Sequence, residues 1–90
     1  MVIVVYDIPD DKRRTKLAHF LEGYGDRVQR SVFELFITVD EMRLLHQKVK
    51  KLVVPAEDNV RFYWIPDEVR ALVLTIGSLQ PEPPPNRYTL

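Results

Sequence analysis

The chain has 90 residues, contains no cysteine, and carries 13 basic and 13 acidic residues, so its formal net charge is zero. This length allows one small domain, the lack of cysteine excludes disulfides and thiolate metal sites, and the balanced charge provides no general attraction for nucleic acid. No apolar run reaches the ~20 residues that a membrane-spanning helix requires. A strand begins directly after Met1 without a basic leader, so we predict a soluble, cytoplasmic protein.

The N-terminal segment is the feature around which the chain is organised. Val2–Tyr6 is a run of β-branched residues that ends in an aromatic, and its lack of polar alternation predicts a strand buried on both faces. Asp7 follows at the strand end, and Pro9 breaks the strand. Asp10 or Asp11 is then placed to cap a helix. A carboxylate and the start of a helix are therefore predicted at one junction.

The next segment, residues 11–24, predicts an amphipathic helix because apolar residues recur at i, i+3, i+4 and i+7. Gly23 and Gly25 are expected to end it, since glycine accepts a left-handed cap. The apolar stripe consists of Leu17, Phe20, Leu21 and Tyr24.

The remaining chain predicts three or four further strands and one further helix. Asp40 is the expected N-cap of that helix, and Pro55 stops it. Asp58 and Asn59 then predict a turn. From Pro81 the sequence is too rich in proline for a helix or a central strand. The expected ranges are strands at Arg27–Arg30, Val32–Val39, Val60–Ile65 and Arg70–Ile76 and a helix from Asp40 to about Val53.

This order is strand, helix, strand, strand, helix, strand, with one additional strand. It predicts an α+β, ferredoxin-like βαββαβ sandwich over residues 1–77, followed by a proline-rich tail over residues 78–90. Such a sheet carries both helices on one face, whereas the first strand is apolar on both sides. A second copy of the sheet is the simplest cover, so we predict a homodimer in which the additional C-terminal strand is exchanged or docked.

Asp7 is the first candidate functional residue. A carboxylate at the end of a buried strand needs pairing, hydration or a metal, and oxygen ligands of this kind suit Mg²⁺. One carboxylate per chain makes a poor metal site, whereas two Asp7 side chains facing across a dimer axis could hold a metal that activates water for phosphodiester hydrolysis. The alternative is a helix cap or an ion pair with Arg13 or Arg14.

A group of cations near Asp7 is the second candidate. Clustered cations bind phosphates, although a run of charges on a helix is also typical of a solvated face. Phe33 has two interpretations as well, a ring that stacks on a base or a core residue, whereas Phe62 and Trp64 are expected in the core. The cations are Lys12, Arg13, Arg14, Lys16, Arg27 and Arg30.

Three segments in order resemble the motifs of the small CRISPR-associated proteins known as Cas2. They are residues 6–17 (YDIPDDKRRTKL), residues 27–34 (RVQRSVFE) and residues 60–63 (VRFY) with the apolar segment that follows. The resemblance extends from Val2 to Gly77. It implies a ferredoxin-like homodimer, a role in spacer acquisition in which the dimer bridges two dimers of the CRISPR integrase and holds duplex DNA, and an Mg²⁺-dependent endonuclease activity on single-stranded RNA or double-stranded DNA.

The resemblance also assigns roles to single residues. The metal-binding aspartate corresponds to Asp7, the basic substrate contacts to Arg14, Lys16 and Arg27, and the motif phenylalanine to Phe33. Several relatives carry an aromatic or aliphatic residue in place of Arg30. Three hypotheses therefore stand: a metal-dependent endonuclease with Asp7 as its catalytic residue, a non-catalytic adaptor that positions duplex DNA, and a generic ferredoxin-like regulator.

Overall fold

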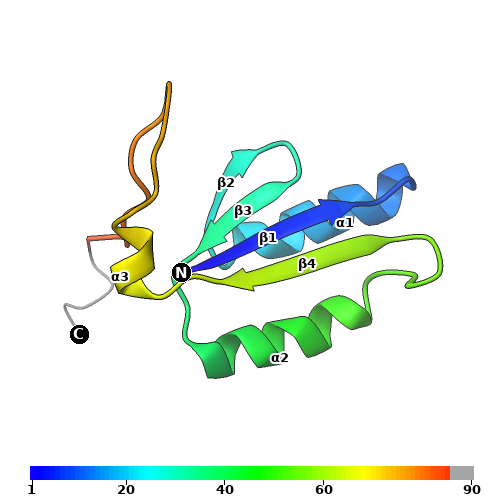
Figure 1. Cartoon of the computed structure of the whole chain (residues 1–90). Helices are drawn as coiled ribbons and strands as arrows, with labels where there is room; N and C mark the ends of the chain where they lie inside the picture. The colour runs from blue at the N-terminus through cyan, green and yellow to red at the C-terminus, as the bar shows by residue number, and fades with distance from the viewer. Residues whose placement is uncertain (86–90) are drawn as a thin grey trace.

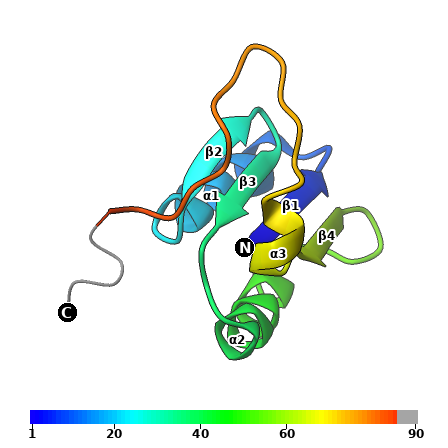
Figure 2. The same cartoon turned by 60° about the vertical axis from the view of Figure 1, so that its left-hand side comes forward.

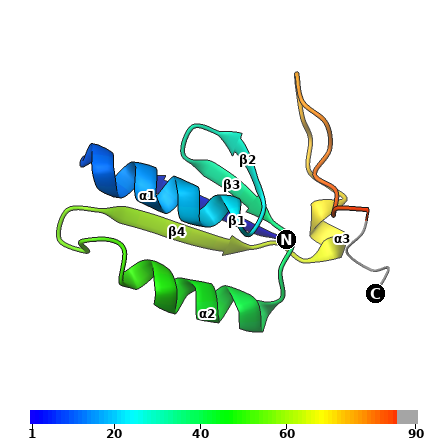
Figure 3. The same ribbon diagram turned by 180° about the vertical axis from the view of Figure 1, so that it is seen from behind.

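A computed structural model describes residues 1–85, which form an antiparallel four-stranded sheet with two helices on one face (Figures 1 and 3). The strand order is β2-β3-β1-β4, as a ferredoxin-like α+β fold requires. No helix in the described residues is long and apolar enough to cross a membrane. The elements are β1 (Val2–Asp7), α1 (Asp11–Glu22), β2 (Asp26–Gln29), β3 (Val32–Leu35), α2 (Val39–Lys50), β4 (Asn59–Trp64) and the short α3 (Asp67–Arg70).

Strand β1 lies at the centre of the sheet and divides its side chains between two faces. Val2, Val4 and Tyr6 point toward the helices and are almost fully buried, whereas Ile3 and Val5 on the other face are half-buried. The second face, called the open face below, is therefore only partly covered in one chain. The prediction that both faces of this strand are buried holds for the helix side alone.

Helix α1 begins at its predicted cap, because the Asp10 side chain accepts a hydrogen bond from the Arg13 backbone N–H at 2.9 Å. The prediction of a left-handed glycine cap is wrong: Gly23 is the C-cap with a right-handed φ of −72°. Gly25 is needed for another reason, since a Cβ at this position would collide with the backbone carbonyl oxygen of Glu34 in β3. The buried residues of α1 are Leu17, Ala18 and Leu21, with Phe20 and Tyr24 half-buried beside them.

Helix α2 begins two residues before the position expected from Asp40. The side chain of Thr38 accepts from the Glu41 N–H at 3.1 Å, and the Glu41 carboxylate accepts from the Thr38 N–H at 2.9 Å. This reciprocal capping box satisfies two backbone donors at once, which a cap at Asp40 would leave open. Val39 therefore belongs to the helix, and strand β3 ends at Leu35 instead of Val39.

The chain after β4 departs most from the prediction. Residues Asp67–Arg70 form the single turn α3, and residues 71–85 contain no strand, so the strand expected at Arg70–Ile76 is wrong for the single chain (Figure 2). A strand exists only as a member of a ladder, and α3 turns the chain away from the free edge of β4. Residues 86–90 of the predicted tail lie outside the described residues.

The sequence predicts Trp64 in the core. Its side chain lies on the face of the sheet that the helices cover, in register with Val2, but the residue is 39 % exposed. It lies at the end of β4, an edge strand with β1 as its single neighbour, so nothing covers the outer side of the indole. Phe62, two residues earlier, is half-buried against the core as predicted.

Candidate functional site

Asp7 is the last residue of β1 and lies on the open face, in register with Asn59 of β4. The side chain is exposed, and within residues 1–85 its carboxylate has no hydrogen bond or ion pair. The alternative of a cap or of an ion pair with Arg13 or Arg14 is therefore not what this structure shows. Asp10 caps the helix instead, and Arg13 and Arg14 pair with other carboxylates.

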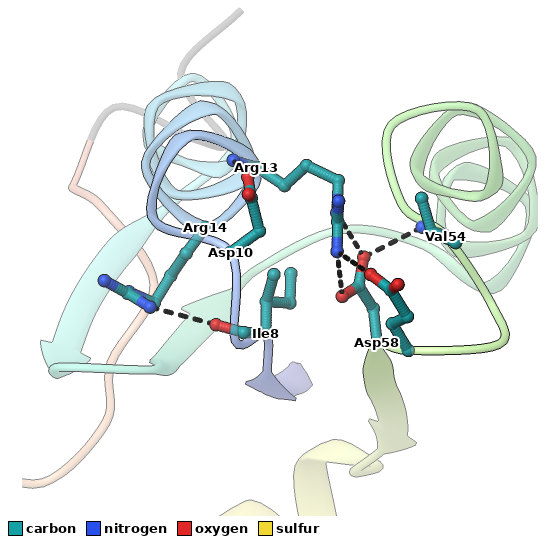
Figure 4. Close-up of polar contacts among 7 residues, drawn as sticks. Ile8, Asp10, Arg13, Arg14, Val54 and Asp58 are labelled. Atoms are coloured by element: carbon teal, nitrogen blue, oxygen red, sulfur yellow. Dashed lines mark hydrogen bonds and ion pairs between the residues drawn. The ribbon is translucent and has the colours of Figure 1, made fainter.

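Arg14 fastens the segment that follows Asp7. Its Nη1 donates to the carbonyl oxygen of Ile8 at 2.9 Å (Figure 4). Its Nη2 pairs with the carboxylate of Asp11 one turn away. A guanidinium has five donors in a fixed fork, so Arg14 retains donors for a ligand after making both contacts. Its side chain is 34 % exposed.

Arg13 points to the other side and joins α1 to the loop before β4. Its Nε and Nη2 donate to the two oxygens of Asp58 at 2.8 and 3.0 Å, and Nη2 also reaches Glu57 at 2.8 Å (Figure 4). The Asp58 side chain is fully buried and accepts a further hydrogen bond from the Val54 N–H at 2.8 Å. These bonds hold the pKa of Asp58 below its usual value and raise the pKa of Arg13.

This ion pair fixes the neighbourhood of Asp7, because Asp58 directly precedes Asn59, the residue opposite Asp7 in the sheet. The sequence predicted only a turn at Asp58. A carboxylate directly before an edge strand is the one sequence signal for this ion pair. It does not identify the arginine partner, which lies 45 residues earlier in the chain.

The other predicted contacts divide into exposed and buried residues. Lys16 is exposed on α1 beside Lys12, and neither ammonium group has an ion pair within the part of the chain that the structure describes. Arg27 is exposed on β2, where its guanidinium donates to the backbone of its own hairpin. Phe33 is fully buried, with its ring 6.4 Å from that of Tyr6. A ring without exposed area cannot stack on a base, so the structure gives Phe33 a packing role in place of the predicted contact.

Asp7 and Asn59 occupy paired positions on neighbouring strands. The carboxylate of Asp7 and the side-chain amide oxygen of Asn59 are oxygen ligands of the kind that Mg²⁺ binds. They are few, however. Residues 1–85 contain no group of three or more histidine, aspartate or glutamate side chains that could hold a metal ion. Asp7 and Asn59 alone would therefore not complete a metal site, and any further carboxylate ligand would have to come from another molecule.

Comparison with known proteins gives consistent matches. Residues 1–71 match the family described as CRISPR associated protein Cas2. The chain is 46 % identical over 63 residues to the CRISPR-associated endoribonuclease Cas2 3 of Synechocystis sp., covering 70 % of this chain and 68 % of the relative. It is 42 % identical over 76 residues to the CRISPR-associated endonuclease Cas2 2 of Thermus thermophilus, covering 84 % and 82 %.

Solved structures agree with these matches. One chain of a partial Cas6-RT-Cas1–Cas2 complex superposes with a TM-score of 0.75 at 33 % identity, covering 99 % of this chain and 97 % of that one.

Proposed function

The chain belongs to the CRISPR-associated Cas2 family, and on that premise we propose that two copies pair through their open faces to form a Mg²⁺-dependent endonuclease of CRISPR adaptation. The observation that carries the proposal is the free carboxylate of Asp7 at the end of the central strand, beside cations that pair elsewhere or remain exposed. The family resemblance assigns the metal to this aspartate. Two relatives bear the names endoribonuclease and endonuclease, which supports a nuclease.

The open face supports the pairing. Its centre is apolar, formed by Ile3 and Val5 of β1 with Val32 of β3, and all three are half-buried. Its two edges have opposite character, with acidic side chains on the β2 and β3 side and a cation on the β4 side. A two-fold pairing that sets each acidic edge against the other copy's basic edge is complementary in charge. The edge residues are Asp26, Glu34 and Arg61.

The segment after α3 supports the same pairing. Leu72, Leu74 and Ile76 are 74 %, 93 % and 103 % exposed, and they recur at every second residue, as on one face of a strand. Exposed apolar side chains in this pattern indicate a covering partner. In the proposed dimer this segment forms the additional strand, on the sheet of the second copy.

The proposed roles follow from the positions of the groups. Asp7 of each copy, with Asn59 beside it, supplies oxygen ligands, and Mg²⁺ when bound would acidify a water molecule and neutralise phosphate charge. Lys16 and the free donors of Arg14 bind phosphates next to the strand end. Arg13 acts indirectly, because its ion pair with Asp58 holds Asn59 in position.

The test is Mg²⁺-dependent cleavage by Asp7→Asn, purified in parallel with the wild type and with Asp40→Asn as a matched control. Asp40 is an exposed aspartate on α2, away from the strand end. The proposal expects cleavage of RNA or DNA by the wild type and the control, and none by Asp7→Asn, with all three proteins equally folded and dimeric. Wild-type cleavage rates in Asp7→Asn would refute it.

A second function, a non-catalytic adaptor, is favoured by the small number of carboxylates near Asp7. The presence of Cas1 and Cas2 in one solved complex supports an integrase as the partner. Its test is spacer acquisition in cells after Asp7→Asn and after charge reversal at Lys12 and Lys16, which lack structural ion pairs. Acquisition that survives the first change and fails after the second supports the adaptor, and the reverse result excludes it.

A further inference from the structure

The turn between β2 and β3 is held by an unusual number of hydrogen bonds to one carbonyl group. The backbone oxygen of Arg30 accepts from Arg27 Nε at 3.1 Å, from Arg27 Nη2 at 2.6 Å and from the Tyr6 hydroxyl at 3.3 Å. Three donor groups, two on Arg27 of β2 and one on Tyr6 of β1, therefore fix the backbone of Arg30.

The turn needs such support because its backbone does not suit a short hairpin. Gln29 pairs with Val32, so Arg30 and Ser31 alone form the loop. Two-residue loops favour turns with positive φ, whereas no non-glycine residue among those described has a positive φ. The register also shifts between Arg27 and Gln29, which bends the strand. The contacts from Tyr6 and Arg27 hold this irregular hairpin in one conformation.

The hairpin lies beside Asp7. Val5 pairs with Val32, and the Tyr6 N–H then donates to the Ser31 carbonyl at 3.1 Å, which continues the ladder by one step. Arg30 directly precedes Ser31 in the turn and accepts a hydrogen bond from the Tyr6 hydroxyl, so its backbone lies near the end of β1, where Asp7 follows Tyr6. Asn59 of β4 and the turn that carries Arg30 therefore lie on opposite sides of the end of β1.

Arg30 is also the available cation of this hairpin. Its side chain is exposed, and its guanidinium has no hydrogen bond or ion pair within residues 1–85, whereas Arg27 commits two donor nitrogens to the turn. We propose that Arg30 binds a phosphate of the nucleic acid next to Asp7, and that Arg27 and Tyr6 are positioning residues that hold Arg30 there. A guanidinium matches a phosphate through two parallel N–H donors. This inference rests on the proposed function, since it adds a substrate contact to the same site.

The experiment measures binding of a labelled DNA duplex as a function of salt for Arg30→Ala, Arg30→Lys and the matched control Arg43→Ala. Arg43 is a cation of α2 that is 76 % exposed, and its one ion pair, with Asp40, is long at 3.9 Å. We expect Arg30→Ala to lower the slope of log affinity against log salt by about 0.9 for each Arg30 that contacts a phosphate. Arg30→Lys should keep the slope while weakening binding. Arg43→Ala should match the wild type.

A double-mutant cycle separates positioning from direct contact. Arg27→Lys keeps the positive charge but loses the two hydrogen bonds to the Arg30 carbonyl. It should therefore weaken binding when it is the only substitution and have no further effect when added to Arg30→Ala. Equal binding by Arg30→Ala and Arg43→Ala would overturn the inference, and so would additive effects in the cycle. A wild-type protein that binds neither this duplex nor a single-stranded RNA at low salt would instead refute the proposed function itself, which distinguishes the two failures.

Discussion

Replacing Leu74 by aspartate tests whether the segment after α3 packs on a second copy. The side chain is 93 % exposed in one chain, so its substitution costs the isolated subunit little. Full burial of a leucine stabilises by ~1.5–3 kcal/mol, and burying an unpaired carboxylate in its place adds a further penalty. A loss of about 3 kcal/mol at each of the two Leu74 positions, about 6 kcal/mol per dimer, corresponds to a dimer dissociation constant raised by roughly 10,000-fold.

Sedimentation equilibrium over a range of protein concentrations measures this change. Leu44→Asp is the matched control, because Leu44 is 64 % exposed on α2, outside the open face and the segment after α3. We expect Leu74→Asp to dissociate and Leu44→Asp to remain dimeric at the same concentration. Equal dissociation constants for the two variants, or a wild type that is monomeric throughout, would refute the reasoning.

Three further predictions concern the fold. Thr38→Ala should lower the free energy of unfolding in urea by ~1 kcal/mol, and Asp40→Asn by less, because Thr38 is the cap; the opposite order would restore the cap to Asp40. Phe33→Leu should cost less than the ~3–5 kcal/mol of a truncation to alanine and leave duplex affinity unchanged, whereas a large loss of affinity at full folding would point to base contact. Burial and a nearby aspartate raise the pKa of Glu34, so the folded form binds the proton more tightly and the ionised carboxylate opposes folding at neutral pH. In the monomeric Leu74→Asp background, Glu34→Gln should therefore raise Tm at neutral pH, with a gain that shrinks as the pH falls through the folded pKa; a gain independent of pH would contradict this.

The regular part of the fold follows from local sequence patterns. The β-branched run at Val2–Tyr6, the apolar stripes of α1 and α2, and the alternation in β4 each predict an element that is present within a few residues of its expected ends. These patterns are readable because each element buries one face against the same core. The order of the elements then leaves few topologies to choose from.

Several of the departures from prediction share one cause, which is that the deciding partner is distant in sequence or absent from a single chain. The sequence around Asp58 indicates only a turn, because its partner Arg13 lies on another element, and the same contact removes Arg13 from the free cations. The sequence does not decide between a core position and a base contact for Phe33, since the alternation of a short strand does not tell which face is covered. The segment after α3 has the pattern of a strand but no ladder to join.

The site was predictable in its chemistry and not in its details. Asp7 and the basic residues after it were evident as a group, but the sequence did not show which cations remain free. Arg13, Arg14 and Arg27 all have partners within the chain, whereas Lys16 and Arg30 have none among the described residues. Which arginine pairs with which carboxylate depends on distances of a few ångströms between elements, and composition does not encode them.

The most direct test of the account is the distance between the two Asp7 positions in solution. The chain contains no cysteine, so Asp7→Cys gives a single attachment point for a nitroxide label on each copy. Pulsed dipolar spectroscopy should then give one narrow, short distance that disappears when Leu74→Asp is added. Labels without dipolar coupling, or with a long distance that places the two strand ends on opposite sides of the dimer, would contradict the proposed site.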